Sequence, residues 1–210
     1  MNFKQSDVDN LLKIMKNRRD VRGNRFLDKK IKKEKIDLIL EAAFSAPSVG
    51  YSQPWEFVLI DEDEVKDEIY SIFESENEKA KDIFKSRPMY EQLKLEGIKE
   101  APLNIAVLYN EPNEEVLGQT SMSKTGEYSV VCAVQNMWLM ARALNIGMGW
   151  VSILNDEKVK RTIKASDKHK LVAYLCLGYV DEFLNEPELK ILKWKEQKDK
   201  SSLISYNFYK

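Results

Sequence analysis

The sequence of 210 residues has two cysteines and one histidine, and each scarcity removes a class of protein. Cys132 and Cys176 lie far apart in apolar runs without Cys-x-x-Cys spacing, so we expect buried free thiols, and neither a disulfide nor a metal site. His169 is flanked by Lys168 and Lys170 and is expected to be a surface residue. With one histidine, neither a His-centred catalytic triad nor a zinc site can be assembled.

An excess of charge of either sign is also missing. Thirty-three basic side chains against 34 acidic ones give a net charge of -1, so no overall field attracts nucleic acid or an anionic membrane. Residues 1–10 are polar and lack the apolar core of a secretion signal. No window approaches the roughly 18 uncharged apolar residues of a membrane span. We therefore expect a cytoplasmic protein that binds neither nucleic acid nor membrane.

No repeat, low-complexity tract or linker divides the chain, and its apolar content of 43% is enough for one sizeable core. Residues 1–210 are therefore predicted to form a single domain. Its last part, from about 186 to 210, is polar with isolated aromatics and is predicted to be an extended C-terminal tail that wraps a partner surface.

Hydrophobic periodicity predicts alternating helices and strands. Ser6 and Asp9 resemble a capping box for a first helix that ends close to Arg18, and a second helix ends before Pro47. Strands are predicted at 55–60, 104–109, 147–153 and 171–180, helices within 66–99, at 129–144 and after Asn155, and a long loop at 111–126. Helix 129–144 is apolar nearly all round, which suits either a central core helix or a dimer interface. The order favours an α+β domain with a mixed central sheet flanked by helices.

The segment Arg18-Arg19-Asp20-Val21-Arg22 is the strongest candidate for a functional site. Guanidinium forks suit phosphate oxygens, so three of them near a helix end indicate a site for a phosphorylated ligand. Asp20 would repel a phosphate, so it either pairs with an arginine or faces another part of the ligand as a base. The alternative is a solvated basic face at a helix end. No P-loop or complete dinucleotide fingerprint is present, which excludes those two nucleotide-binding folds.

Six segments together resemble the nitroreductase superfamily and, more narrowly, its 5,6-dimethylbenzimidazole synthase branch. They are residues 18–22, 46–50 with 53–55, 93–98, 128–129 with 131–136, 149–153, and 175–178. The resemblance runs from about residue 10 to residue 190, with the motifs in the order that the family has.

The resemblance implies a nitroreductase-like, FMN-binding α+β fold and an intertwined homodimer with FMN at the subunit interface. Pro47 and Ser48 match a turn that approaches the flavin from the other subunit. The segment 93–98, which contains Leu95, matches part of a cover over the ring. The residues implied in binding FMN are Arg18, Arg19, Asp20, Val21, Arg22, Pro47, Ser48, Leu95 and Ser152.

Asp20 and Ser152 carry the reaction that the branch implies. Reduced FMN reacts with O2 and is broken apart to give the lower-ligand base of cobalamin, so the flavin is the substrate and a separate flavin reductase must supply it. Asp20 is then the base, since fragmentation requires removal of protons, and Ser152 hydrogen-bonds the ring or relays protons. The alternatives are an Asp20 that only positions Arg19 or Arg22, and a Ser152 satisfied by backbone.

Two other functions stay open at this stage. One is a conventional FMN-dependent NAD(P)H nitroreductase or quinone oxidoreductase, and the other is a flavin carrier without catalysis. The chain departs from the branch after Trp194, where relatives commonly have an arginine that reaches the phosphate. Lys195 and Lys198 are the candidates for that role, although each supplies a point charge and not a fork.

Overall fold

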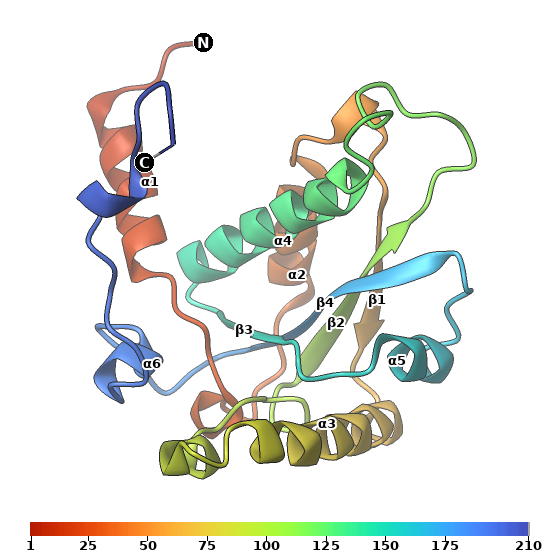
Figure 1. Cartoon of the computed structure of the whole chain (residues 1–210), viewed down its shortest axis with the longest axis vertical. Coiled ribbons are helices and arrows are strands. Elements are labelled where there is room, and N and C mark those ends of the chain that lie inside the picture. The colour runs from red at the N-terminus through yellow and green to blue at the C-terminus, as the bar shows by residue number, and fades with distance from the viewer. Residues whose placement is uncertain (210) are drawn as a thin grey trace.

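Four strands form one sheet between two layers of helices in the computed structural model, which describes residues 1–209 (Figure 1). The helices are α1 Gln5–Asn17, α2 Lys33–Phe44, α3 Asp63–Ile83, α4 Thr125–Ala143, α5 Asp156–Thr162 and α6 Glu188–Ile191. The strands are β1 Trp55–Ile60, β2 Leu103–Asn110, β3 Gly147–Val151 and β4 His169–Gly178. Short 3-10 turns lie at Gly23–Arg25, Val49–Tyr51, Pro88–Gln92 and Ser201–Leu203.

The sheet has the order β1-β2-β4-β3, and every neighbouring pair of strands is antiparallel. The α+β class is therefore confirmed. Parallel pairing among the described residues is limited to one isolated bridge between Asp20 and Met148, so the predicted mixed character of the sheet is confined to that edge.

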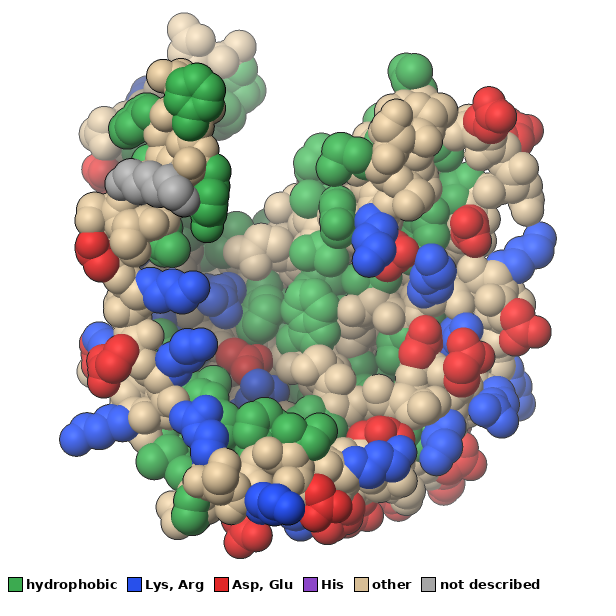
Figure 2. Space-filling view, viewed as in Figure 1, with side chains coloured by type: hydrophobic (Ala, Val, Ile, Leu, Met, Phe, Trp, Pro, Cys, Tyr) green, Lys and Arg blue, Asp and Glu red, His purple; other side chains and the backbone are tan. Residues whose placement is uncertain are grey.

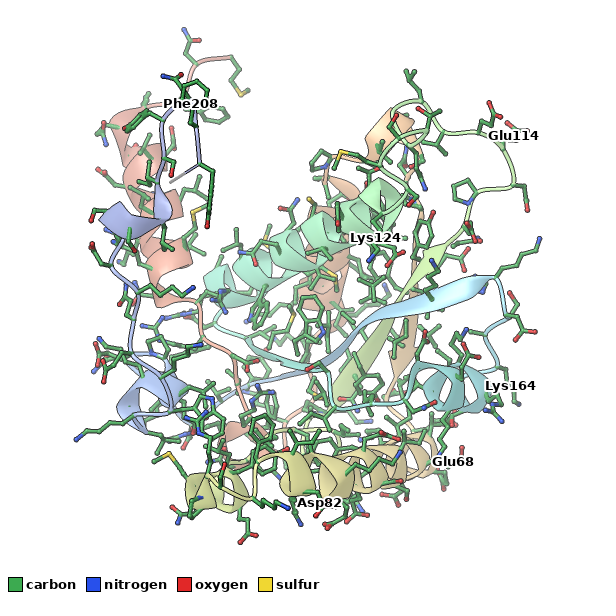
Figure 3. The ribbon with its side chains drawn as sticks, viewed as in Figure 1. Glu68, Asp82, Glu114, Lys124, Lys164 and Phe208 are labelled. Carbon is green, nitrogen blue, oxygen red and sulfur yellow. The ribbon has the colours of Figure 1, made fainter. Side chains whose placement is uncertain are left out.

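The core lies on both faces of the sheet because the two middle strands carry long apolar stretches, 105–109 in β2 and 171–177 in β4. Ile105, Val107 and Tyr109 of β2 pack toward α2 and α4, whereas Ala106 packs toward α3 and α5. A strand covered on both faces needs a continuous apolar run rather than alternation. The outer face of α3 is charged and points to solvent, as Glu68 and Asp82 illustrate (Figure 3).

Helix α1 stands apart from the rest of the molecule, beside the C-terminal tail (Figure 1). Its apolar residues Val8, Leu11, Leu12 and Met15 are exposed. The tail adds further exposed apolar side chains, among them Phe208 near the start of α1 (Figure 3). The predicted capping box at Ser6 and Asp9 is wrong by two residues, because Asp7 accepts the N–H of Lys4 at 2.7 Å and the helix begins at Gln5.

Two further expectations need correction. Cys132 is exposed, since α4 buries only part of its surface and leaves Tyr128, Val131 and Cys132 open; Cys176 is buried as expected. His169 was expected at the surface but begins β4 with only 15% of its side chain exposed, and its ring lies between Ser166 and Glu56 at 2.9 and 3.0 Å. Within residues 1–209, no helix combines the length and the apolar content that crossing a membrane requires.

Candidate functional site

The arginine segment lies along the free edge of β3, and glycine at position 149 makes this approach possible. Val21 donates its N–H to the carbonyl of Met148 at 3.1 Å. A Cβ at Gly149 would lie 2.1 Å from the carbonyl oxygen of Val21, far inside van der Waals contact. The absence of a side chain therefore allows Asp20 and Val21 to run against the strand.

Asp20 is held at both carboxylate oxygens. Oδ1 accepts the backbone N–H of Trp150 at 3.0 Å, and Oδ2 forms an ion pair with Arg22. Burial raises the pKa of Asp20 above its usual value, although Arg22, the Trp150 N–H and Arg18 act in the opposite direction. The side chain still has 35% of its surface exposed, so the carboxylate is fixed in orientation and remains accessible.

Arg22 ties three parts of the site together. Besides its ion pair with Asp20, its Nη1 donates to the carbonyl of Leu95 at 3.1 Å and to that of Trp150 at 3.2 Å. The segment after Leu95 is anchored nearby, because Gly23 donates to the carbonyl of Glu96 at 2.8 Å. The predicted cover is thus joined to the segment that carries Asp20.

Arg19 points away from this arrangement and holds the tail. Its guanidinium donates to the carbonyls of Lys16 at 2.8 Å, Arg18 at 2.7 Å and Leu184 at 2.8 Å, and also to that of Asn185. These bonds use most of the five donors of a guanidinium. Arg19 therefore fixes the chain that leads into α6, and in this arrangement it has little capacity left for a ligand.

Arg18 is the arginine of this segment whose guanidinium donates no hydrogen bond within the described residues. Its guanidinium lies over the ring of Trp138 with Cζ 4.5 Å from the centroid, and lines the cavity described below. Burial lowers the pKa of Arg18, the carboxylate of Asp20 raises it and the like charge of Arg19 lowers it. A partly desolvated cation in this setting favours an anionic ligand.

These residues surround a cavity of about 160 Å³ whose other wall is the cover and α6. It is lined by Arg18, Arg19, Asp20, Arg22, Leu93, Lys94, Leu95, Pro187, Glu188 and Leu189. The cavity wall therefore combines apolar surface from leucines with cationic groups, as a ring with a phosphate would require. Figure 2 also shows a hollow between α1 and α4, with Lys and Arg side chains gathered along the side of α1, α6 and the tail.

The cover has its own internal support. Glu96 is only 2% exposed, accepts the N–H of Ile98 at 2.8 Å and forms an ion pair with Lys94. Although burial acts against it, the contacts with Glu100 and Glu96 raise the pKa of Lys94. The charge of Lys94 is thus already compensated, and its contribution to the cavity wall is mainly its aliphatic chain.

Four predicted residues do not line this cavity within one subunit: Val21, which is buried beside β3, and Pro47, Ser48 and Ser152. Pro47 and Ser48 precede the turn at Val49–Tyr51, where Val49 donates to Ser129 Oγ at 3.1 Å near the start of α4. Trp138, beneath Arg18, lies about 14 Å further along that helix at 1.5 Å per residue. Ser152 is exposed and directly follows β3, two residues after the Trp150 that binds Asp20.

Comparison with known proteins identifies the family. The model of the nitroreductase family matches residues 15–179. The chain belongs to the nitroreductase family. The family predicted from the motifs is thereby confirmed.

Curated relatives within the nitroreductase family bear the name of the predicted branch. The 5,6-dimethylbenzimidazole synthase of Rhodospirillum rubrum is 38% identical over 200 residues, which cover 93% of this chain and 94% of that protein. A protein of the same name from Rhodobacter capsulatus is 35% identical over 201 residues, covering 93% of this chain and 96% of its own. These relatives and the family confirm the predicted branch and enzyme class, a flavin-dependent oxidoreductase.

A solved structure agrees with the fold. Oxidized iodotyrosine deiodinase bound to FMN and 3-iodo-L-tyrosine superposes with a TM-score of 0.73 at 20% identity, covering 95% of this chain and all of that one. At this identity the likeness concerns the fold alone, and it confirms the nitroreductase-like architecture.

Sequence reasoning missed the residues that support the site. Trp138 lies within the apolar helix predicted at 129–144 and was not predicted as a site residue, yet its Nε1 donates to the carbonyl of Arg19 at 3.1 Å and Arg18 stacks on its ring. A usable signal existed, because a tryptophan seldom buries its N–H without a partner. Nothing in the sequence pointed to Gly149 as the contact for Val21, or to Glu96 as the anchor of the cover.

Proposed function

We propose that this protein is a 5,6-dimethylbenzimidazole synthase that fragments reduced FMN with O2. The observation that carries the proposal is Asp20, an accessible carboxylate in the cavity wall with one oxygen bound by the Trp150 N–H and the other paired with Arg22. A flavoenzyme that only exchanges hydride has no need of a base there, whereas fragmentation of the flavin requires proton removal.

The residues present fit FMN as the ligand. Arg18 offers guanidinium donors suited to phosphate, and Leu93, Leu95 and Leu189 supply apolar wall for a ring. Asp20 and Val21 run along the edge of β3. We assign phosphate binding to Arg18, contacts to the ring and its side chain to Asp20, Val21 and Leu95, and support of Asp20 to Arg22.

Asp20 acts as the proton acceptor in this proposal. Two of about four acceptor sites of its carboxylate are used by Trp150 and Arg22, so others remain for a proton of the ligand. Burial raises the pKa of Asp20, which makes it a stronger base than an exposed carboxylate. Reduced FMN supplies the carbon framework and the electrons for oxygen. The exposed hydroxyl of Ser152, beyond the same strand, relays protons or binds the ring.

A homodimer would complete the site. The cavity of about 160 Å³ is smaller than the roughly 300–1,000 Å³ of typical small-molecule sites, so FMN would extend into the hollow beside α4. Pro47 and Ser48 are far along α4 from Arg18 in the same subunit, so they would serve the site of a second one. The exposed apolar residues of α1 supply a face for that partner.

Consumption of the flavin requires a supply of reduced FMN. We assign this to a separate flavin reductase that draws electrons from NAD(P)H, since each turnover would remove one flavin. Two free thiols, one of them exposed, suit a reducing compartment such as the cytoplasm.

The decisive experiment is aerobic incubation of the protein with chemically reduced FMN, followed by mass spectrometry. The proposal predicts 5,6-dimethylbenzimidazole with loss of FMN; intact FMN after many hours would refute it.

A second candidate is an NAD(P)H nitroreductase, because a Bacillus subtilis relative named putative NAD(P)H nitroreductase YfhC is 27% identical over 84% of this chain and 86% of its own. Rapid NAD(P)H oxidation with a nitroaromatic acceptor and no benzimidazole would favour that function.

A further inference from the structure

Two arginine–tryptophan stacks occur in the described part of the chain, and they differ in what the arginine has left to offer. Arg87 lies 3.5 Å from the ring centroid of Trp194, and its Nη2 donates to the carbonyl of Trp194 at 2.6 Å. Arg18 lies 4.5 Å from the ring centroid of Trp138, and among residues 1–209 no hydrogen bond from its guanidinium accompanies the stacking. Only the second stack presents free donors to the cavity.

Trp138 is held in a defined orientation. Its Nε1 donates to the carbonyl of Arg19 at 3.1 Å, so the indole is bonded to the residue next to the arginine that it supports. On another side its ring packs against that of Trp150, with centroids 6.4 Å apart. A side chain fixed by α4, by Trp150 and by the backbone at Arg19 restricts where Arg18 can lie.

We propose that Trp138 is a positioning residue that holds Arg18 in place for the terminal phosphate and thereby makes the site prefer FMN over riboflavin. This inference rests on the proposed function in so far as the ligand is a flavin. Without the indole, a long arginine side chain between the charges of Arg19 and Asp20 would sample many rotamers, and binding would have to order it. The stack supplies that order before the ligand arrives.

Equilibrium binding of FMN and of riboflavin, followed by flavin fluorescence in the full-length protein, tests the proposal. Trp138→Leu should weaken FMN binding about two- to thirtyfold, the range of a cation–π contact, and leave riboflavin binding nearly unchanged. Trp138→Phe keeps a ring but loses the N–H and should fall between. Trp194→Leu, which removes the other stack, should leave the ratio of the two affinities as it is.

A double-mutant cycle separates positioning from general loosening. In an Arg18→Met background, Trp138→Leu should cost no further FMN affinity, because the indole acts through Arg18. Additive effects of Arg18→Met and Trp138→Leu on FMN affinity would overturn the inference alone. So would equal weakening of FMN and riboflavin binding in a Trp138→Leu protein whose thermal unfolding is unchanged. Failure of the unaltered protein to bind either flavin would overturn the proposed function and this inference together.

Discussion

Oδ1 of Asp20 accepts the backbone N–H of Trp150 at 3.0 Å, across 130 positions of sequence. This bond continues the edge of β3, where Val21 already donates to Met148. The carboxylate thus occupies the position of a strand carbonyl, and its orientation is fixed by the sheet edge on one side and by Arg22 on the other. A base built in this way keeps its orientation without a ligand.

Replacing Asp20 by asparagine should abolish product formation and preserve flavin binding. The amide oxygen can still accept the Trp150 N–H, but it cannot take a proton, and loss of a general base typically costs about 100- to 10,000-fold in rate. Benzimidazole formation by mass spectrometry and FMN affinity by fluorescence measure the two effects. Glu188→Gln, which neutralises another carboxylate on the cavity wall, is the control and should stay active. Product from Asp20→Asn at the normal rate would remove Asp20 from the mechanism.

The pH dependence should reflect the raised pKa of Asp20. Because the base must be ionised, the single-turnover rate should rise with pH through a value above that of an ordinary aspartate. Arg22→Met removes an attraction that lowers this pKa, so the rise should move to higher pH, and Arg22→Lys should move it less. A shift to lower pH in Arg22→Met would contradict this assignment.

The carboxyl of Asp20 also makes the free energy of unfolding depend on pH. A carboxyl with a higher pKa in the folded than in the unfolded state holds its proton more tightly when folded. Its contribution to stability is complete below the unfolded pKa of about 3.9 and is lost as the pH rises through the folded value.

Gly149→Ala should displace the arginine segment. The new Cβ would lie 2.1 Å from the carbonyl oxygen of Val21, and backbone cannot move aside as a side chain can. We expect a loss of about 1–3 kcal/mol in the free energy of unfolding together with loss of FMN binding. Gly147→Ala is the matched comparison, since its nearest neighbour is the Val180 side chain at 2.4 Å. Chemical denaturation should show that Gly147→Ala is destabilised, and flavin titration should show that it still binds FMN. Equal loss of FMN binding in both variants would argue against displacement of the arginine segment as the cause.

Arg19→Gln should release the tail. The hydrogen bonds to the carbonyls of Leu184 and Asn185 would be lost, and charged hydrogen bonds contribute about 1.5–3 kcal/mol. Hydrogen exchange should therefore rise in the segment 184–194, which limited proteolysis can confirm. Arg18→Gln should instead leave exchange in the tail unchanged and weaken FMN binding. The opposite pattern would reverse the division of roles between the two arginines.

Leu12→Glu should convert a dimer into monomers. Leu12 is 45% exposed on the apolar face of α1, and a buried charge without a partner is unfavourable in an interface. Sedimentation should give twice the chain mass for the unaltered protein and the single mass, with weak FMN binding, for the variant. Lys13→Glu changes charge at the neighbouring exposed position and should remain dimeric. A monomeric unaltered protein that binds FMN fully would exclude the shared site.

Local elements were predictable where one signal dominated. The strand Trp55–Ile60 has the predicted bounds because a β-favouring apolar run ends at acidic residues, and Asn155 caps α5 by accepting the N–H of Lys158 at 3.0 Å. The exposure of Cys132 was not predictable. A helix that is apolar nearly all round has the same sequence pattern whether its second face packs on the core of its own subunit or on another subunit.

The sequence by itself determined the family, the fold class and the chemical types at the site, because motifs and hydrophobic periods are local properties of the chain. Only the tertiary structure decided how the three arginines divide their roles: Arg18 stacks on Trp138, Arg19 binds the tail and Arg22 pairs with Asp20. The three side chains are chemically identical, so the sequence alone does not distinguish their roles. What separates them is which carbonyls, rings and carboxylates distant segments bring within hydrogen-bonding reach, and that depends on contacts more than a hundred residues apart.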